Sequence, residues 1–280
     1  MHFNTIKILV TVLFLFLLVS AAASEAGQKS RSFTNEDLEK YGSTPSPPAR
    51  PAEATDSQAE EISPKPVEHP LKKYVIPYSG GSRRIIIPVT FNGRITANML
   101  LDTGAPGMHI SNNLARELGL LDDKESNLWV TIGGIGGSVP AIFTIMDSIR
   151  VGEAENRFIP TFISPSISSE FDGLIGMDFM ADYEVKIDNQ KQVVIFEELP
   201  ESSSLPAGHD ERWWKATFSQ FKSLRLTWER YREQIFKRES FTEREKELRM
   251  FVDRQYRKAN DLYDKLSVYA SEHSVPHEWR

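Results

Sequence analysis

The chain has 280 residues, 40% of them hydrophobic and 26% charged, and its formal net charge is −6 at pH 7. This length accommodates one large domain or two small ones, and the mild negative charge argues against a general nucleic-acid-binding protein, which needs a basic surface. The absence of cysteine excludes disulfides, thiol nucleophiles and cysteine-bound zinc, and the sequence also lacks the His-Glu-x-x-His, Gly-x-Ser-x-Gly and phosphate-loop motifs.

Residues 1–23 have the layout of a secretory signal peptide. The basic side chain of Lys7 precedes an apolar run from Ile8 to Val19 that only Thr11 interrupts, and Ala21-Ala22-Ala23 supplies small residues for cleavage. The apolar run is shorter than the roughly 20 residues that a membrane-spanning helix needs. We therefore predict a cleaved signal and an exported, soluble protein. If the signal stays uncleaved, this segment is a possible inner-membrane anchor and the protein's contact with the membrane.

Residues 24–73 are rich in Ser, Pro, Glu and Ala and show little hydrophobic periodicity. The run Pro45-Ser46-Pro47-Pro48 prevents helix or sheet locally. This composition is typical of a disordered linker, which we predict for the whole segment.

Residues 74–200 predict a small, mainly β domain, because β-branched and apolar residues come in short runs that Gly, Asn, Asp and Pro separate. Asn92-Gly93 is a strong signal for a two-residue hairpin turn, and Pro88 indicates an edge strand or a bulge. Ser111 is suited to cap a short helix that runs through Leu118 and stops at Gly119. The predicted strands are Arg84 to Phe91, Arg94 to Leu101, Leu128 to Ile132, Val139 to Ile149, Tyr183 to Ile187 and Gln192 to Phe196.

Residues 209–275 predict two charged helices with apolar stripes. The stripe of the first helix contains Trp214, Phe221, Trp228 and Ile235, which recur at every seventh position. Ser240-Phe241-Thr242-Glu243 matches a capping box and predicts the start of the second helix. The stripe of the second helix consists of Leu248, Val252, Ala259, Leu262 and Leu266. Two such stripes on either side of a short break predict a helical hairpin or a coiled-coil pair, in which the aromatic side chains form packing surface.

The run Leu100-Leu101-Asp102-Thr103-Gly104-Ala105 places a carboxylate at the end of an apolar strand. Gly104 permits a sharp turn and Thr103 offers a hydroxyl that can lock the loop. Such a loop can hold a carboxylate in a partly buried place, where its pKa can be tuned. The same tetrapeptide also occurs as a simple turn after a strand, so the motif alone does not separate a catalytic loop from a structural one.

Four features in residues 85–197 resemble the retropepsin-like aspartic protease family, specifically its bacterial single-domain members. They are the strand pair joined by Asn92-Gly93 that leads into Asp102-Thr103-Gly104-Ala105, the helix Ser111 to Leu120, the run Gly133-Gly134-Ile135-Gly136-Gly137 between two strands, and Asp172-Gly173-Leu174-Ile175-Gly176-Met177-Asp178-Phe179. Their order and spacing make the resemblance specific. It covers somewhat under half of the chain and does not extend to the linker or the helices.

The resemblance implies a mainly β fold, a retropepsin-like closed β-barrel, with the α-helical hairpin or coiled coil following it. It implies that Asp102, Thr103 and Gly104 form the catalytic loop of an aspartic-type endopeptidase, a hydrolase of protein or peptide substrates that needs no cofactor and no metal. The Gly133–Gly137 run corresponds to the family's flap, which closes over the substrate. The bacterial character of the family implies a periplasmic or secreted protein.

Aspartic proteolysis uses two carboxylates that share one proton, and this chain has a single Asp-Thr-Gly. Asp172 and Asp178 lack the following Thr-Gly and fall in segments that the resemblance makes structural. We therefore predict a symmetric homodimer in which Asp102 of each subunit meets its counterpart on the two-fold axis and Thr103 bonds across that axis. The last hairpin or the helical tail would supply further dimer contacts.

Two residues depart from the family pattern. Pro106 stands where the family often has a Ser that bonds the catalytic carboxylate, so the pH optimum is expected to differ. His109 stands in a stretch that is usually apolar, and we interpret it as filling space or capping the next turn. We expect the substrate pocket to be lined by apolar side chains around Ile85 to Val89, at Ile135 and at Ile163.

The alternative to a protease is a non-catalytic module of the cell envelope. Such a module would bind peptides through a protease-like β domain and assemble through its coiled-coil tail. The intact Asp-Thr-Gly favours the enzyme, because a module without catalytic activity has no need for the carboxylate.

Overall fold

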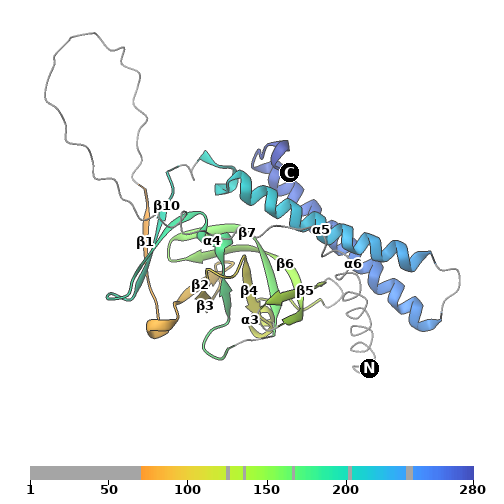
Figure 1. Cartoon of the computed structure of the whole chain (residues 1–280), viewed down its shortest axis with the longest axis horizontal. Helices are drawn as coiled ribbons and strands as arrows, with labels where there is room; N and C mark the ends of the chain where they lie inside the picture. The colour runs from red at the N-terminus through yellow and green to blue at the C-terminus, as the bar shows by residue number, and fades with distance from the viewer. Residues whose placement is uncertain (1–70, 124–126, 135–136, 166–167, 201–203, 238–241) are drawn as a thin grey trace, which may run out of the picture. The chain divides into compact units, whose positions relative to one another are not determined.

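The computed structural model describes residues 71–123, 127–134, 137–165, 168–200, 204–237 and 242–280 (Figure 1). The predicted signal peptide and nearly all of the predicted linker lie outside these residues. The chain separates into two units, 1–68 and 69–280, and every described residue belongs to the second unit. None of the described helices is long and apolar enough to cross a membrane.

The centre of the second unit is a barrel. One sheet has the strand order β2-β3-β8-β4-β7-β6-β5, and an additional pairing between β2 and β6 closes the first six strands into a ring. The strands are β2 (Ile86–Phe91), β3 (Ile95–Leu101), β8 (Gly173–Ile175), β4 (Met108–Ser111), β7 (Ala154–Ser164), β6 (Gly137–Val151) and β5 (Leu128–Gly134). The prediction of a mainly β domain with a closed barrel is confirmed.

The barrel encloses an apolar core because alternate residues of each strand point inward. In β2, for example, Ile87, Val89 and Phe91 are fully buried, whereas the intervening Pro88 is exposed. Pro88 lies in the part of β2 that pairs with β3 but not with β6, as the prediction of an edge position requires. The turn after β2 contains Asn92 and Gly93, both with positive φ, which is the geometry that the predicted two-residue hairpin needs.

A second sheet pairs the first strand of the β domain with its last two strands. Its order is β1 (Lys73–Pro77), β10 (Val193–Glu198) and β9 (Tyr183–Asp188), with every pairing antiparallel. The predicted strands Tyr183 to Ile187 and Gln192 to Phe196 therefore pair with each other as a hairpin. Two short helices complete the domain. They are α3 (Asn112–Glu117), whose N-cap Ser111 accepts a hydrogen bond from Leu114, and α4 (Met177–Met180).

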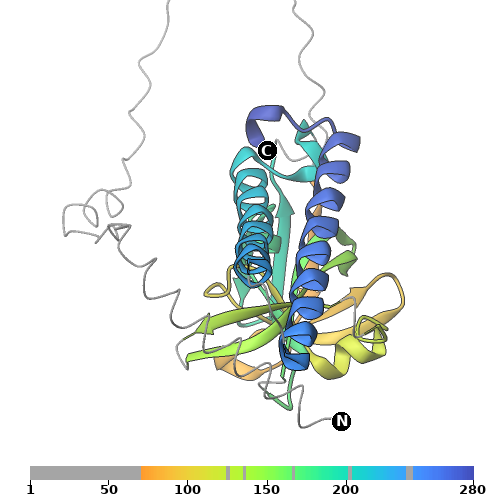
Figure 2. The same ribbon diagram turned by 90° about the vertical axis from the view of Figure 1, so that its right-hand side faces the viewer.

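A helical hairpin follows the β domain. Helices α5 (Glu211–Phe236) and α6 (Glu243–Glu272) lie side by side (Figures 1 and 2), and the four heptad residues predicted in α5 are all buried. The predicted cap of α6 is wrong by two residues, since Thr242 rather than Ser240 is the N-cap and Glu245 rather than Glu243 completes the capping box. Both positions fit the same Ser/Thr-x-x-Glu pattern, so the pattern cannot choose between them.

The hairpin packs against the barrel through aromatic side chains. Phe221 of α5 meets Phe143 of β6 edge-on at 5.1 Å, and Tyr269 of α6 stacks on Phe158 of β7 at 4.4 Å between ring centroids. Phe158 adopts a positive φ of 58°, which is uncommon for a bulky residue. The aromatic residues of the tail thus serve as packing surface against the β domain.

Candidate active site

Asp102 lies at the point where β3 ends and the loop to β4 begins. Strands β3 and β4 are not neighbours, because β8 lies between them, parallel to β3 and antiparallel to β4. The loop 102–107 must therefore pass across the end of β8. Backbone hydrogen bonds fix this crossing: Asp102 N donates to Ile175 O at 3.0 Å, and Met177 N donates to Ala105 O at 2.9 Å.

The close approach of loop and strand depends on Gly176, which follows β8. A Cβ atom at this position would lie 2.5 Å from the carbonyl oxygen of Ala105 and 2.6 Å from that of Gly107. Gly173 is equally tight, since a Cβ there would lie 2.1 Å from the carbonyl oxygen of His109. These two positions accept no side chain without displacing the loop or β4.

The predicted catalytic residues stand together on this loop. Asp102 is half-buried and its Oδ1 accepts a hydrogen bond of 2.9 Å from Gly104 N, whereas Thr103 and Gly104 are exposed. The loop thus presents Asp102 at the surface with one carboxylate oxygen already held by the backbone. The other two carboxylates near it serve the scaffold, because Asp172 accepts from Asn98 N and Asp178 accepts from Phe179 N.

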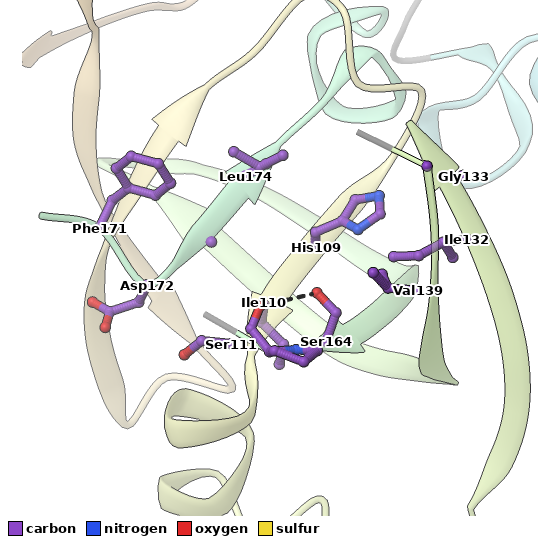
Figure 3. Close-up of a pocket in the computed structure, with 13 residues that line it drawn as sticks. His109, Ile110, Ser111, Ile132, Gly133, Val139, Ser164, Phe171, Asp172 and Leu174 are labelled. Carbon is purple, nitrogen blue, oxygen red and sulfur yellow. Dashed lines mark hydrogen bonds between the residues drawn. The ribbon is translucent and has the colours of Figure 1, made fainter. Parts of the chain in front are cut away.

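A pocket of about 330 Å³ is lined by β4, into which this loop leads, by β8 and by the β5–β6 hairpin (Figure 3). Its floor includes Leu174, next to Ile175, whose carbonyl oxygen bonds Asp102 N. Its lining is mostly apolar and comprises His109, Ile110, Ser111, Ile132, Gly133, Gly137, Val139, Ser164, Pro165, Phe171, Asp172, Gly173 and Leu174. The predicted lining is wrong for Ile87, Val89 and Ile163, which are buried in the barrel core. Predicted residue Ile135 lies outside the described residues.

His109 is the pocket residue that the sequence interpretation missed. It projects into the pocket with Leu174 on one side and Ile132 on the other (Figure 3), and its ring stacks on Phe162 at 5.1 Å. Burial lowers its pKa, and the negative charge of Asp102 opposes this shift in part. At neutral pH this shift favours the uncharged imidazole, a polar group in the wall of an apolar pocket. The sequence could have indicated this position, because side chains alternate along a strand. His109 lies between the buried residues Met108 and Ile110, so its side chain points to the other face of β4.

The β5–β6 hairpin supplies the other wall. The two strands pair from Leu128 with Phe143 at the base to Gly134 with Gly137 at the tip. Gly133 and Gly137 of the predicted flap line the pocket together with Ile132 and Val139. The remaining tip residues, Ile135 and Gly136, lie outside the described residues.

Asp178 lies against the loop 102–107, since its backbone N–H donates to Pro106 O at 3.1 Å. Burial raises the pKa of this carboxyl to about 6, although backbone N–H groups of Phe179 and Met108 bond it and favour its charged form. The nearby charge of Asp182 raises the pKa slightly further, and that of His209 lowers it slightly. The protonated form therefore prevails over a wider pH range in the folded protein than in the unfolded chain.

We expect Asp178 to make the protein less stable as pH rises from about 4 to about 6. The folded state binds the proton more tightly, so its contribution is fully present below the unfolded pKa and is lost as pH passes the folded value, by up to about 3 kcal/mol. Urea denaturation between pH 4 and pH 7 measures this slope. Asp178→Asn should flatten it, whereas Asp147→Asn at an exposed site should not. An unchanged slope in Asp178→Asn would show that another group titrates.

Within the described residues, no three or more His, Asp or Glu side chains are grouped so as to hold a metal ion. The described residues of the site comprise the half-buried carboxylate of Asp102, the imidazole of His109 and an apolar pocket.

Comparisons with known proteins bear on this site. A family model described as aspartyl protease matches residues 87–179, which include the Asp102 loop, the pocket and α4 but exclude the helical hairpin. A crystal structure of a retropepsin-like aspartic protease from Rickettsia conorii matches with 19% identity and a TM-score of 0.38, covering 46% of this chain and 92% of that one. At these values the structural likeness carries no conclusion about function. No curated protein matched.

Proposed function

We propose that this protein is an exported aspartic endopeptidase with Asp102 as its acid/base residue, and the match of residues 87–179 to the aspartyl protease family model supports this proposal. The observation that carries the proposal is that the Asp102-Thr103-Gly104 loop bonds the end of β8 and leads into β4, two strands that line an apolar pocket together with a glycine-rich hairpin.

The reaction needs two carboxylates that share one proton. Like charges so close together cannot both ionise easily, so one member of the pair stays protonated. The ionised member takes a proton from a water molecule, whose oxygen attacks the peptide carbonyl carbon. The protonated member donates a hydrogen bond to the carbonyl oxygen and stabilises the charge that develops there. Backbone N–H of Gly104 helps to fix the orientation of the Asp102 carboxylate for these steps.

The second carboxylate is proposed to come from a second copy of the chain. Asp172 and Asp178 are held by the scaffold, and the exposure of Thr103 and Gly104 leaves the loop accessible to an identical loop. A two-fold axis beside the loop would bring the two Asp102 side chains together and place each Thr103 against its counterpart.

The pocket supports a preference for an apolar substrate side chain. Ile132, Val139 and Leu174 offer apolar surface, and the neutral imidazole of His109 adds one polar edge without a charge. An extended peptide would lie between this floor and the β5–β6 hairpin, which we propose to act as the flap.

Export rests on residues 1–23 alone, which have the composition of a signal peptide. The destination, the bacterial periplasm or the medium, is proposed from the resemblance to bacterial single-domain members of the family, with an anchored form if the signal is retained.

The proposal predicts inhibitor-sensitive cleavage of peptides by the purified protein. A mixed peptide library is incubated from acidic to neutral pH with and without a pepstatin-like inhibitor, and products are identified by mass spectrometry. We expect cleavage next to apolar residues that the inhibitor suppresses. Binding of peptides without any cleavage would support the non-catalytic peptide-binding module instead, and cleavage that the inhibitor leaves unchanged would exclude the aspartic mechanism.

A further inference from the structure

Gln255 of α6 makes two hydrogen bonds that tie the helical hairpin to the base of the β5–β6 hairpin. Its side chain is almost completely buried, with 2% exposure. Its Oε1 accepts a hydrogen bond of 2.7 Å from Trp129 N, and its Nε2 donates one of 2.9 Å to Asn127 O. A buried amide with both groups satisfied against one strand is a specific contact, because leaving either group unpaired would be costly.

These two bonds reproduce the pattern of a neighbouring parallel strand. In a parallel pair, one residue donates to the carbonyl oxygen before its partner and accepts from the N–H after it. The side-chain amide of Gln255 does the same around Leu128, because it bonds Asn127 O and Trp129 N. Among the described strands β5 is the last in the sheet order, so the helix supplies a partner on the side where the sheet ends.

The other strand of the hairpin is held by the other helix. Phe143 of β6 pairs with Leu128 at the hairpin base and packs edge-on against Phe221 of α5. The same Phe143 contacts Phe162, which stacks on His109 in the pocket wall, with ring centroids 5.1 Å apart at each step. The contacts of the tail therefore continue through the β sheet to the pocket.

We propose that Gln255 is a positioning residue for the β5–β6 hairpin, and that through it the helical tail fixes the pocket wall that contains Ile132 and Gly133. The inference rests on the proposed function of the hairpin as the flap. An exposed sheet edge can be covered by any apolar helix face, but the buried amide also sets the height and direction of β5. A shift at Leu128 is carried along the strand to Ile132 and Gly133, which line the pocket.

The first test compares Gln255→Met with wild type in the full chain. Met fills a similar volume but makes neither bond, so we expect the Trp129 amide to exchange hydrogen about tenfold faster or more, while amides of the β1-β10-β9 sheet keep their rates. Affinity for a pepstatin-like peptide should fall about tenfold, with a higher KM and a smaller change in kcat. Gln234→Met, at an exposed site of α5, is the matched control.

The second test uses Gln255→Glu, which reports on the bonds through pH. A protonated carboxyl can accept from Trp129 N and donate to Asn127 O, whereas the ionised form cannot donate and repels the carbonyl oxygen. We expect the ratio of variant to wild-type kcat/KM, and of their Trp129 exchange rates, to approach one at acidic pH and to diverge toward neutral pH. Taking ratios at each pH removes the titration of the other groups.

The outcomes separate the inference from the proposed function. Unchanged Trp129 exchange in Gln255→Met, or a pH-independent ratio in Gln255→Glu, would overturn the role of Gln255. Faster exchange with unchanged peptide affinity would reduce Gln255 to a structural contact and also overturn the proposal. A wild type that neither cleaves nor binds peptide would instead refute the proposed function, whatever the exchange rates show.

Discussion

Replacing Asp102 by Asn is expected to reduce peptide cleavage by at least about a thousandfold, because Asn can neither take a proton from water nor donate an acidic proton to the carbonyl oxygen. The fold should survive, since the Oδ1 of Asn still accepts the hydrogen bond from Gly104 N. The change is measured as kcat/KM on a fluorogenic peptide, with urea denaturation to verify the fold. An exposed substitution of the same kind, Asp147→Asn, should leave both quantities unchanged.

The same variant tests the dimer when it is mixed with wild type. If chains exchange freely and each active site needs two Asp102 side chains, an equal mixture contains about one quarter wild-type homodimers and should show about one quarter of the activity of wild type at the same total concentration. A chain that acts alone would give about one half. Mixing the chains in urea and refolding them together ensures exchange. Activity that falls in simple proportion to the wild-type fraction would refute the shared site.

The strand pattern was readable from the sequence because it depends on local chemistry. Asn92-Gly93 has few alternatives to a tight hairpin turn, and from Ile87 to Phe91 every second residue of β2 is fully buried. Ser111 caps α3 by a bond to Leu114, which is only three residues away. In each case the determining contacts lie within a few residues, where sequence pattern and structure coincide.

The side-chain composition of the pocket was harder to predict, because it depends on which strands become neighbours. Ile163 and Val89 look equally suited to a core and to an apolar pocket, and only the barrel closure between β2 and β6 places them inside. His109 appeared to be an irregularity in an apolar stretch, yet it faces the pocket. The hydrogen bonds of Gln255 to Asn127 and Trp129 join residues that are 126 or more positions apart, so no local sequence pattern predicts them.

Gly176→Ala is expected to destabilise the protein by about 3 kcal/mol and to lower kcat/KM by about a hundredfold. The added Cβ would lie 2.5–2.8 Å from three backbone atoms of the loop, namely Ala105 O, Gly107 O and Gly107 N. Backbone atoms cannot rotate away as a flexible side chain can, so the loop itself must move, at a cost typical of overpacked cores or greater. That movement strains the bonds from Asp102 N to Ile175 O and from Met177 N to Ala105 O, which set the height of the carboxylate.

Gly133→Ala is the matched control for stability, because a Cβ there would meet only Ser138 Oγ, at an ordinary distance of 3.8 Å. Urea denaturation should place this control within about 1 kcal/mol of wild type, since an exposed substitution without a steric clash has a small effect on stability. Its activity is not used as a control, because Gly133 lines the pocket. Activity should be compared without urea, at a temperature at which Gly176→Ala is still folded. The loss of kcat/KM then reports the displaced loop. A Gly176→Ala protein with wild-type stability and activity would show that the loop is not fixed against β8, and the geometry proposed for Asp102 would then fail with it.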